Sequence, residues 1–175
     1  MALLTIIKFP DLRLKLRSDE VTVFDDELRN FVRDMGDTMY TAPGVGLAAV
    51  QVGVLKRILV LDANSGEPDS KLEVFINPEI LSADGEIIYE EGCLSLPDFS
   101  EEVKRKEKVG VRYQDERGMR HEMELEGFRA IILQHELDHL DGVLATDRVS
   151  RLKRSLYIRR RSRVAREESQ EDAHV

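Results

Sequence analysis

The sequence contains only one cysteine, Cys93, and no long apolar run. A single cysteine cannot form a disulfide within the chain, and an unpaired thiol without secretory features is typical of a reducing compartment. The apolar run at residues 2–7 is too short for a signal peptide and is followed at once by Lys8, and no stretch reaches the length of a membrane span. We therefore expect a cytoplasmic protein with no membrane segment and no disulfide partner.

Positive charge is also scarce over the chain as a whole, because 26 basic residues face 34 acidic ones and give a net charge of −8. This balance argues against nucleic-acid binding by the whole surface. The length of 175 residues, with 42% hydrophobic and 34% charged residues, fits one globular domain that buries a core.

The basic residues that are present gather near the C-terminus. Residues 151–166 contain eight basic residues and no acid, and residues 167–175 contain four acids. We predict a folded domain over residues 1–150, a basic helix over 151–166 and an acidic disordered tail over 167–175. The helix is either a docking arm or a solvated terminal helix. Its thin apolar edge consists of Leu152, Leu156 and Val164.

The most informative stretch is residues 127–142, where a mostly apolar helix is predicted between two glycines. His135 and His139 are four residues apart, so both imidazoles leave the same face of that helix. Burying two histidines and the carboxylate of Glu136 is costly unless something compensates them. A divalent metal ion would do so, with the glutamate acting on water beside it. The alternative is a helix with two hydrogen-bonded core histidines.

Two histidines do not complete a metal site, since a catalytic divalent ion usually has three protein ligands. Cys93 is the best third candidate because it follows a predicted strand and carries the only thiol, although most free cysteines are simply small buried hydrophobes. Glu91 and Asp138 remain as carboxylate options. His121 lies in an alternating hairpin pattern and is expected to be an ordinary exposed histidine.

The other predicted elements are one helix and several short strands. The helix is predicted over residues 23–40, where Thr22 and Asp25 form a capping-box pattern. The small, uncharged residues at 44–51 allow close backbone approach, and no Lys-Ser/Thr follows them as in a phosphate loop. Strands are predicted over residues 57–62, 72–76, 86–91, 109–113 and 119–125, the last two as a hairpin. We expect an α+β fold, with short antiparallel β-sheets around a buried central metal-binding helix.

Three segments resemble the signature motifs of the peptide deformylase family, in the same order and with similar separations. They are residues 44–51 (GVGLAAVQ), 91–95 (EGCLS) and 134–139 (QHELDH). The resemblance spans about residues 3 to 150, and the order of elements is similar to the bacterial form with a helical C-terminus. It implies that residues 1–150 are a catalytic metallohydrolase domain. Its substrate would be the N-terminal formyl-methionine of nascent polypeptides, from which it would release formate.

The resemblance also implies roles for individual residues. Fe²⁺ would be the native ion, with Zn²⁺ or Ni²⁺ able to replace it, and a water would complete a tetrahedron. Glu136 would be the general base and then the acid, while the Gln51 amide and the Leu94 backbone N–H would stabilise the oxyanion. The metal ligands would be Cys93, His135 and His139.

A methionine pocket and a set of supporting residues follow from the same resemblance. Glu91 would pair with Arg105, and Asp138 would support a histidine or cap locally. Two features depart from many relatives: residues 98–100 contain no arginine, and the position of Tyr89 is often aliphatic. The pocket and substrate-binding residues would be Val45, Gly46, Tyr89, Gly92, Phe128, Ile131 and Ile132.

Two alternatives stay open on the sequence. One is a zinc peptidase of the His-Glu-x-x-His type, and the other is a non-catalytic, ribosome-associated metal-binding protein. Formate release from a formyl-Met dipeptide separates the deformylase hypothesis from both. The expected partners are N-formylmethionyl peptides and, through the basic helix, the ribosome, and we expect a monomer.

Overall fold

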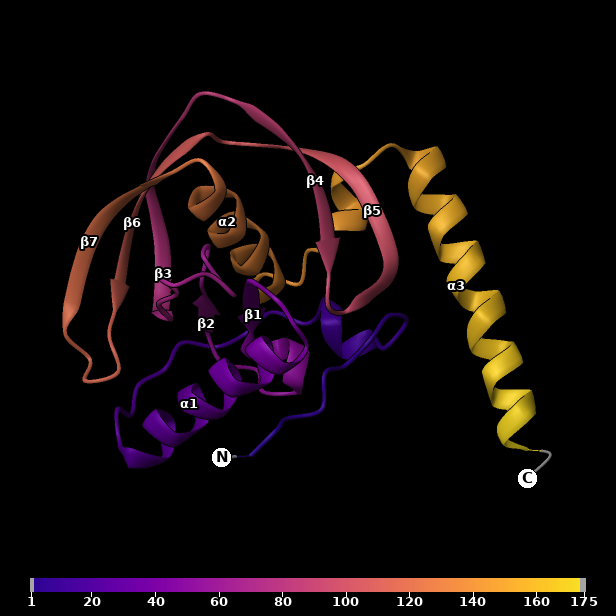
Figure 1. Cartoon of the computed structure of the whole chain (residues 1–175), viewed down its shortest axis with the longest axis horizontal. Coiled ribbons are helices and arrows are strands. Elements are labelled where there is room, and N and C mark those ends of the chain that lie inside the picture. Colours follow the sequence, from indigo (N-terminus) through magenta and orange to yellow (C-terminus); the bar gives the residue numbers. More distant parts are fainter. Residues whose placement is uncertain (1, 174–175) are drawn as a thin grey trace.

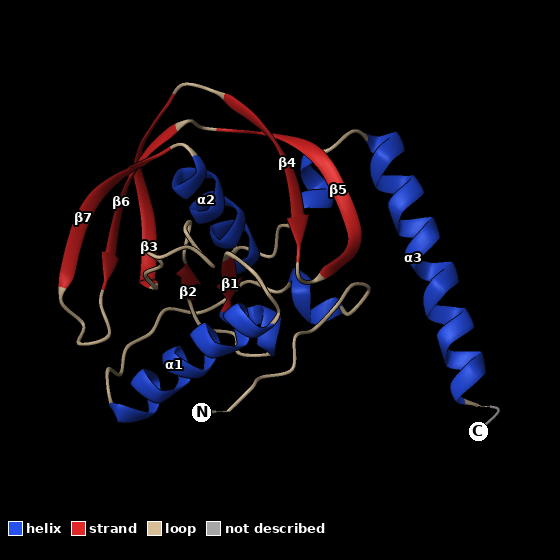
Figure 2. Ribbon diagram, viewed as in Figure 1, coloured by secondary structure: helices blue, strands red, loops and turns tan. Residues whose placement is uncertain are grey.

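The computed structural model describes residues 2–173 and has the predicted α+β architecture. Five antiparallel strands form one sheet in the order β1-β2-β3-β6-β7, and two further strands form a separate hairpin, β4-β5. Figure 1 shows helix α2 between this hairpin and the five-stranded sheet, and Figure 2 shows the same elements by type. The strands of the larger sheet are β1 (Gly46–Ala48), β2 (Ile58–Leu61), β3 (Glu73–Asp84), β6 (Lys108–Gln114) and β7 (Arg120–Glu126).

Helix α2 (Phe128–Leu140) is the predicted buried helix. It begins after Gly127, whose φ of 62° suits glycine, and Gly142 follows its end with a φ of 74°. A Cβ on Gly142 would lie within contact of the Lys15 backbone, so this glycine also allows a close chain crossing. The helix buries residues on most of its sides, including both histidines and Glu136.

The larger sheet separates two parts of the core. Side chains alternate along β2, so Leu59 and Leu61 pack with α2 residues such as Leu133, while Ile58 and Val60 pack against α1. Helix α1 (Asp26–Thr41) presents the buried side chains Val32, Met35 and Met39 to that second face. The short strand β1 lies in contact with α2 and therefore brings the small residues of segment 44–51 close to the histidines.

Helix α1 begins three residues later than predicted, and Thr22 is not its cap. The carboxylate of Asp25 accepts a hydrogen bond from the Leu28 backbone N–H at 2.9 Å, and Asp25 itself is extended, with a φ of −117°. An aspartate is among the best N-caps, so it ends the extended segment that precedes the helix.

The strand predicted over residues 72–76 was too short, and one strand was not predicted at all. β3 does not end at Asn77, because that residue takes a φ of 52° within an irregular stretch and the strand continues to Asp84. The Asn77 side chain exchanges hydrogen bonds with the Val21 backbone at 2.8 and 2.9 Å, which holds this irregularity in place. β4 (Ile87–Cys93) was expected, but its partner β5 (Leu96–Arg105) was not. β5 is rich in charge, and the positive φ of Asp98 interrupts its alternation.

Helix α3 (Arg151–Asp172) follows one flank of the molecule beside β5 (Figure 1). It is longer than predicted, because the three glutamates and the glutamine of residues 167–172 favour helix, and these residues are therefore not a disordered tail. Residues 174–175 of that predicted tail lie outside the described residues. No helix within residues 2–173 combines the length and apolar character needed to cross a membrane.

The buried face of α3 also differs from the predicted apolar edge. Leu152 and Leu156 are 68% and 54% exposed, whereas Tyr157 is 4% exposed. The centroid of the Tyr157 ring lies 5.8 Å from that of Phe9 and 5.4 Å from that of Phe99. The Tyr157 hydroxyl donates a hydrogen bond to the Pro97 carbonyl at 2.9 Å. The helix is therefore anchored by an aromatic residue on the main body of the chain.

Candidate active site

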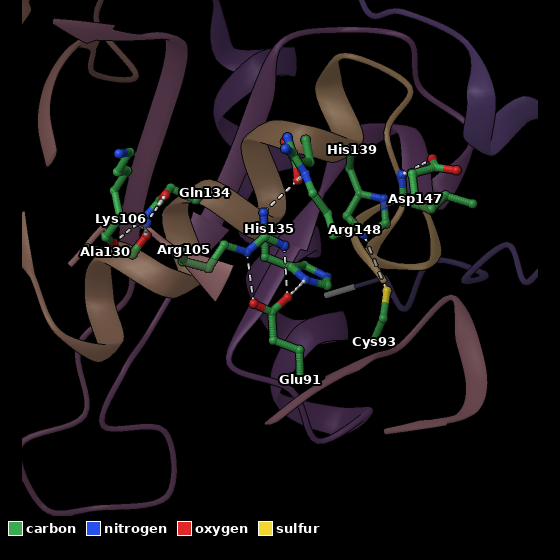
Figure 3. A network of polar contacts seen from close by, with 12 residues as sticks. Glu91, Cys93, Arg105, Lys106, Ala130, Gln134, His135, His139, Asp147 and Arg148 are labelled. Atoms are coloured by element: carbon green, nitrogen blue, oxygen red, sulfur yellow. Dashed lines mark hydrogen bonds and ion pairs between the residues drawn. The ribbon is translucent and has the colours of Figure 1, made fainter. Parts of the chain in front are cut away.

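Cys93, His135 and His139 come together at the centre of the molecule. The Cys93 Sγ lies 3.3 Å from His139 Nε2, and one ligand atom from each of the three residues lies within 4.8 Å of the others. The two imidazole rings are 5.0 Å apart and nearly perpendicular. Figure 3 shows Cys93, at the end of β4, facing His139 from across the site. Within residues 2–173 this is the one group of at least three His, Cys, Asp or Glu side chains close enough to hold a metal ion.

The chemistry of this cluster fits a divalent transition metal. Thiolate and imidazole are ligands of zinc and iron. Burial lowers the pKa of His139 well below its usual range, which favours the neutral, ligating form. Burial would also lower the pKa of His135, but the charge of Cys93 and the hydrogen bonds that Cys93 and Glu91 accept from the ring raise it well above its usual range. The two shifts differ in sign because His135 lies beside Cys93 and Glu91, whereas burial dominates at His139.

Glu136 lies beside this cluster in a buried position. Its side chain is 4% exposed, and Oε2 has no hydrogen-bond partner within the described part of the chain. Burial raises the pKa of Glu136 to about 7, so its carboxyl group can both accept and donate a proton near neutral pH. The backbone of Gly46 passes directly against it, since a Cβ there would lie 2.7 Å from Glu136 Oε1.

A pocket of about 390 Å³ opens onto Glu136, His135 and Cys93. Its volume falls in the range of small-ligand sites. The Tyr89 and Phe128 rings lie 5.3 Å apart in its wall. All seven residues predicted to bind substrate line it: Val45, Gly46, Tyr89, Gly92, Phe128, Ile131 and Ile132.

The sequence model of the polypeptide deformylase family matches residues 3–155. This chain belongs to that family. A peptide deformylase of Thermodesulfovibrio yellowstonii is 49% identical over 157 residues, which cover 90% of this chain and 95% of the relative. The crystal structure of a peptide deformylase from Legionella pneumophila superposes with a TM-score of 0.88 at 42% identity, covering 96% of this chain and 98% of that one. The crystal structure of the peptide deformylase from Thermotoga maritima superposes with a TM-score of 0.81 at 44% identity, covering 86% of this chain and 99% of that one.

Family membership makes the chain a metal-dependent hydrolase of protein N-terminal processing, as the three motifs predicted. It does not favour the zinc peptidase or the non-catalytic metal-binding protein. The family implies formylmethionyl peptides as substrates.

The predicted amide donor of the deformylase site, Gln51, is held at both ends. Its Oε1 accepts from the Ala48 backbone N–H at 2.8 Å, and its Nε2 donates to Ser95 Oγ at 3.0 Å. The same Nε2 lies 3.9 Å from Cys93 Sγ, so the amide faces the cluster. Leu94, also predicted, lines the pocket. Ser95 was not given a role from the sequence, although its place in the cysteine motif was a signal.

The predicted Glu91–Arg105 pair is present and buried, with both side chains 4% exposed. Arg105 donates to both Glu91 oxygens at 2.8 Å, and Glu91 Oε1 lies 2.9 Å from His135 Nδ1. Burial would raise the pKa of Glu91, but the hydrogen bonds to Arg105 and His135 lower it to about 2, so it stays charged. Arg105 also donates to Asp138 at 2.6 Å. Because Glu91 binds Nδ1 of His135, Nε2 is the ring nitrogen that remains available to the cluster.

The remaining histidine in the described chain, His121, lies away from this site. It pairs with Asp115 at 2.8 Å on the β6–β7 hairpin and is 43% exposed. It is the ordinary exposed histidine that the alternating pattern predicted.

Proposed function

We propose that Cys93, His135 and His139 hold the catalytic metal ion and that Glu136 transfers the protons of formyl hydrolysis. The observation that supports this most is the clustering of the three ligand atoms beside one pocket, which is lined by Cys93, His135 and the buried carboxylate of Glu136. Oε2 of that carboxylate has no hydrogen-bond partner within the described residues. When bound, the ion would supply Lewis-acid chemistry, which would lower the pKa of water and polarise the formyl oxygen.

The protein residues then divide the work of the reaction. Glu136 takes a proton from the attacking water and later gives it to the departing amine. The amide of Gln51 and the backbone N–H of Leu94 donate hydrogen bonds to the oxyanion that develops on the formyl group. Substitution of Gln51 is expected to weaken transition-state binding, because Ser95 and Ala48 fix its amide before the substrate arrives.

The substrate lies in the pocket between β1 and β4. Its methionine side chain contacts Phe128, Ile131 and Ile132, and its backbone is bound as an added strand by Val45 and Gly92. The apolar wall of the pocket, which includes Tyr89 and Phe128, supports a preference for an apolar side chain. Residues 98–100 offer no arginine to the far end of the peptide.

The test is substitution of Glu136 by glutamine. Glu136→Gln should keep its metal and lose about 10²- to 10⁴-fold in turnover, because it removes proton transfer without removing a ligand. Formate release from a formyl-Met dipeptide and metal content are measured together, with the exposed Glu126→Gln as control. Loss of the metal in Glu136→Gln would make Glu136 a ligand and contradict the assignment.

We further propose Fe²⁺ as the native ion, with Zn²⁺ and Ni²⁺ as substitutes. The resemblance to the family supports iron, whereas one thiolate and two imidazoles would by themselves suit zinc. Metal analysis after anaerobic purification, with formate release from the same sample, tests this. Zinc alone in fully active protein would refute it.

Helix α3 is proposed to dock on the ribosome, and the enzyme to act there as a cytoplasmic monomer. Arg159, Arg163 and Arg166 are exposed on it, and phosphate contacts would make binding depend steeply on salt. Their joint replacement by glutamine should abolish salt-sensitive co-sedimentation with ribosomes and leave dipeptide turnover unchanged. The matched control replaces Glu167 and Glu168. If both variants bind ribosomes equally well, α3 is only a solvated helix and not a docking element.

A further inference from the structure

A continuous chain of charged contacts connects the predicted ligand His135 to Arg148. Figure 3 labels four of its members, Glu91, Arg105, His135 and Arg148. His135 Nδ1 lies 2.9 Å from Glu91, and Arg105 holds both oxygens of Glu91. Arg105 Nη1 then donates to Asp138 Oδ2 at 2.6 Å. Arg148 closes the chain, donating from Nη2 to Asp138 Oδ1 at 2.8 Å and from Nε to Oδ2 at 3.0 Å.

With His135 neutral, as a metal ligand is, the charges in this chain alternate and balance only if Arg148 is included. Two carboxylates, Glu91 and Asp138, share Arg105, and Arg148 supplies the second cation. Exposure rises along the chain, from 4% at the Arg105 side chain to 14% at Asp138 and 46% at Arg148. An isolated pair as exposed as the last one contributes little to stability. Here, however, the exposed member restrains a nearly buried carboxylate that in turn fixes Arg105.

Arg148 also comes from a different element than its partners. It is the last residue of the short 3-10 helix η3 (Ala145–Arg148), just before Ser150, which caps α3. The bidentate contact therefore ties the start of the C-terminal segment to α2, which carries both histidines. A planar guanidinium on both carboxylate oxygens fixes the direction of Asp138 as well as its charge.

We propose that Arg148 is a positioning residue for the metal ligand His135. By holding Asp138, it keeps Arg105 and hence Glu91 in place, and Glu91 fixes the orientation and tautomer of the His135 ring. The inference rests on the proposed ligand role of His135. Without Arg148, Arg105 is drawn towards an Asp138 that has lost one of its two cations, and its hold on Glu91 loosens.

The experiment compares Arg148→Met and Arg148→Lys with Arg112→Met. Arg112 is 48% exposed and paired with Glu122 on the surface, so it matches Arg148 in exposure but not in connection to the site. The Zn²⁺ dissociation constant is measured by competition with a chelator, the absorption spectrum is recorded with Co²⁺ bound, and thermal unfolding is followed in parallel.

Arg148→Met should raise the Zn²⁺ dissociation constant about three- to tenfold, less than the 10- to 100-fold typical when a direct partner of a ligand is lost. The Co²⁺ bands should shift, because the ligand field changes when the His135 ring reorients. Arg148→Lys should recover only part of both, because it keeps a positive charge beside Asp138 but loses the two-point contact with both carboxylate oxygens. Arg112→Met should change neither.

An unchanged dissociation constant and Co²⁺ spectrum in Arg148→Met would overturn the proposal, even if thermal stability fell, because the pair would then be merely structural. His135→Ala separates this from failure of the proposed function. If His135→Ala binds Zn²⁺ as tightly as the wild type, His135 is not a ligand, and the role of Arg148 falls with that assignment. If His135→Ala weakens Zn²⁺ binding while Arg148→Met has no effect, only the positioning role of Arg148 is refuted.

Discussion

Replacing Gly46 by alanine should disturb catalysis without touching a ligand. Gly46 begins β1 and faces α2 so closely that an added Cβ would lie 2.7 Å from Glu136 Oε1 and 2.9 Å from Glu136 Cγ. It would also lie 2.8 Å from Cγ2 of Ile132. Both neighbours are buried, at 4% and 3% exposure, and Ile132 is a β-branched residue of restricted rotamers. The new methyl group therefore has no free space, and either β1 or Glu136 must move.

The magnitude follows from these contacts. Overpacking of this kind destabilises by about 1–3 kcal/mol, and for a chain of this length each kcal/mol lowers Tm by about 2–4 °C. Because a displacement of about 1 Å can reduce turnover by about 10²-fold, we expect Gly46→Ala to lose about 10- to 100-fold in kcat. Metal content should stay unchanged, since the three atoms nearest to the new Cβ belong to Glu136 and Ile132 and not to the proposed ligands.

Formate release, metal content and thermal unfolding of Gly46→Ala are measured on one preparation. Gly92→Ala is the control for stability, because its Cβ would meet only the Phe99 carbonyl oxygen, at an ordinary 3.5 Å. Wild-type kcat and Tm in Gly46→Ala would refute the argument that β1 is packed directly against the carboxylate of Glu136.

Two further outcomes are expected. Tyr157→Ala should lower the free energy of unfolding, measured in urea, by about 3–5 kcal/mol, because a buried ring is lost. Tyr157→Phe should lower it by about 1 kcal/mol, because only the hydrogen bond to Pro97 is lost. Wild-type stability in Tyr157→Ala would mean that α3 is not anchored on the main body of the chain. Fe²⁺-loaded enzyme should lose activity in air or peroxide as Cys93 is oxidised, and faster than Ni²⁺-loaded enzyme, which mass spectrometry of Cys93 can follow. Iron-loaded enzyme that stays active for days in air would contradict iron ligation by Cys93.

The sequence predicted well wherever the signal was local. The glycines at both ends of α2 and the four-residue spacing of His135 and His139 depend on one helix alone, and both appear as expected. The β6–β7 hairpin was equally clear, because alternation on either side of a turn needs no distant partner. The charged strand β5 was missed since its strand character depends on pairing with β4. Thr22 was taken as the cap in place of Asp25 because both residue types can cap a helix, and the local pattern does not distinguish them.

The motifs of the family identified the site, but the residues that support it were decided only in three dimensions. Cys93 and His139 are 46 positions apart and meet because β4 and α2 lie side by side. Arg148 joins Asp138, and Tyr157 rather than Leu156 anchors α3, because burial and charge pairing depend on what another element presents at that point. Spacing along the sequence determines which side chains share a face, whereas the packing of faces against one another determines which of them become partners.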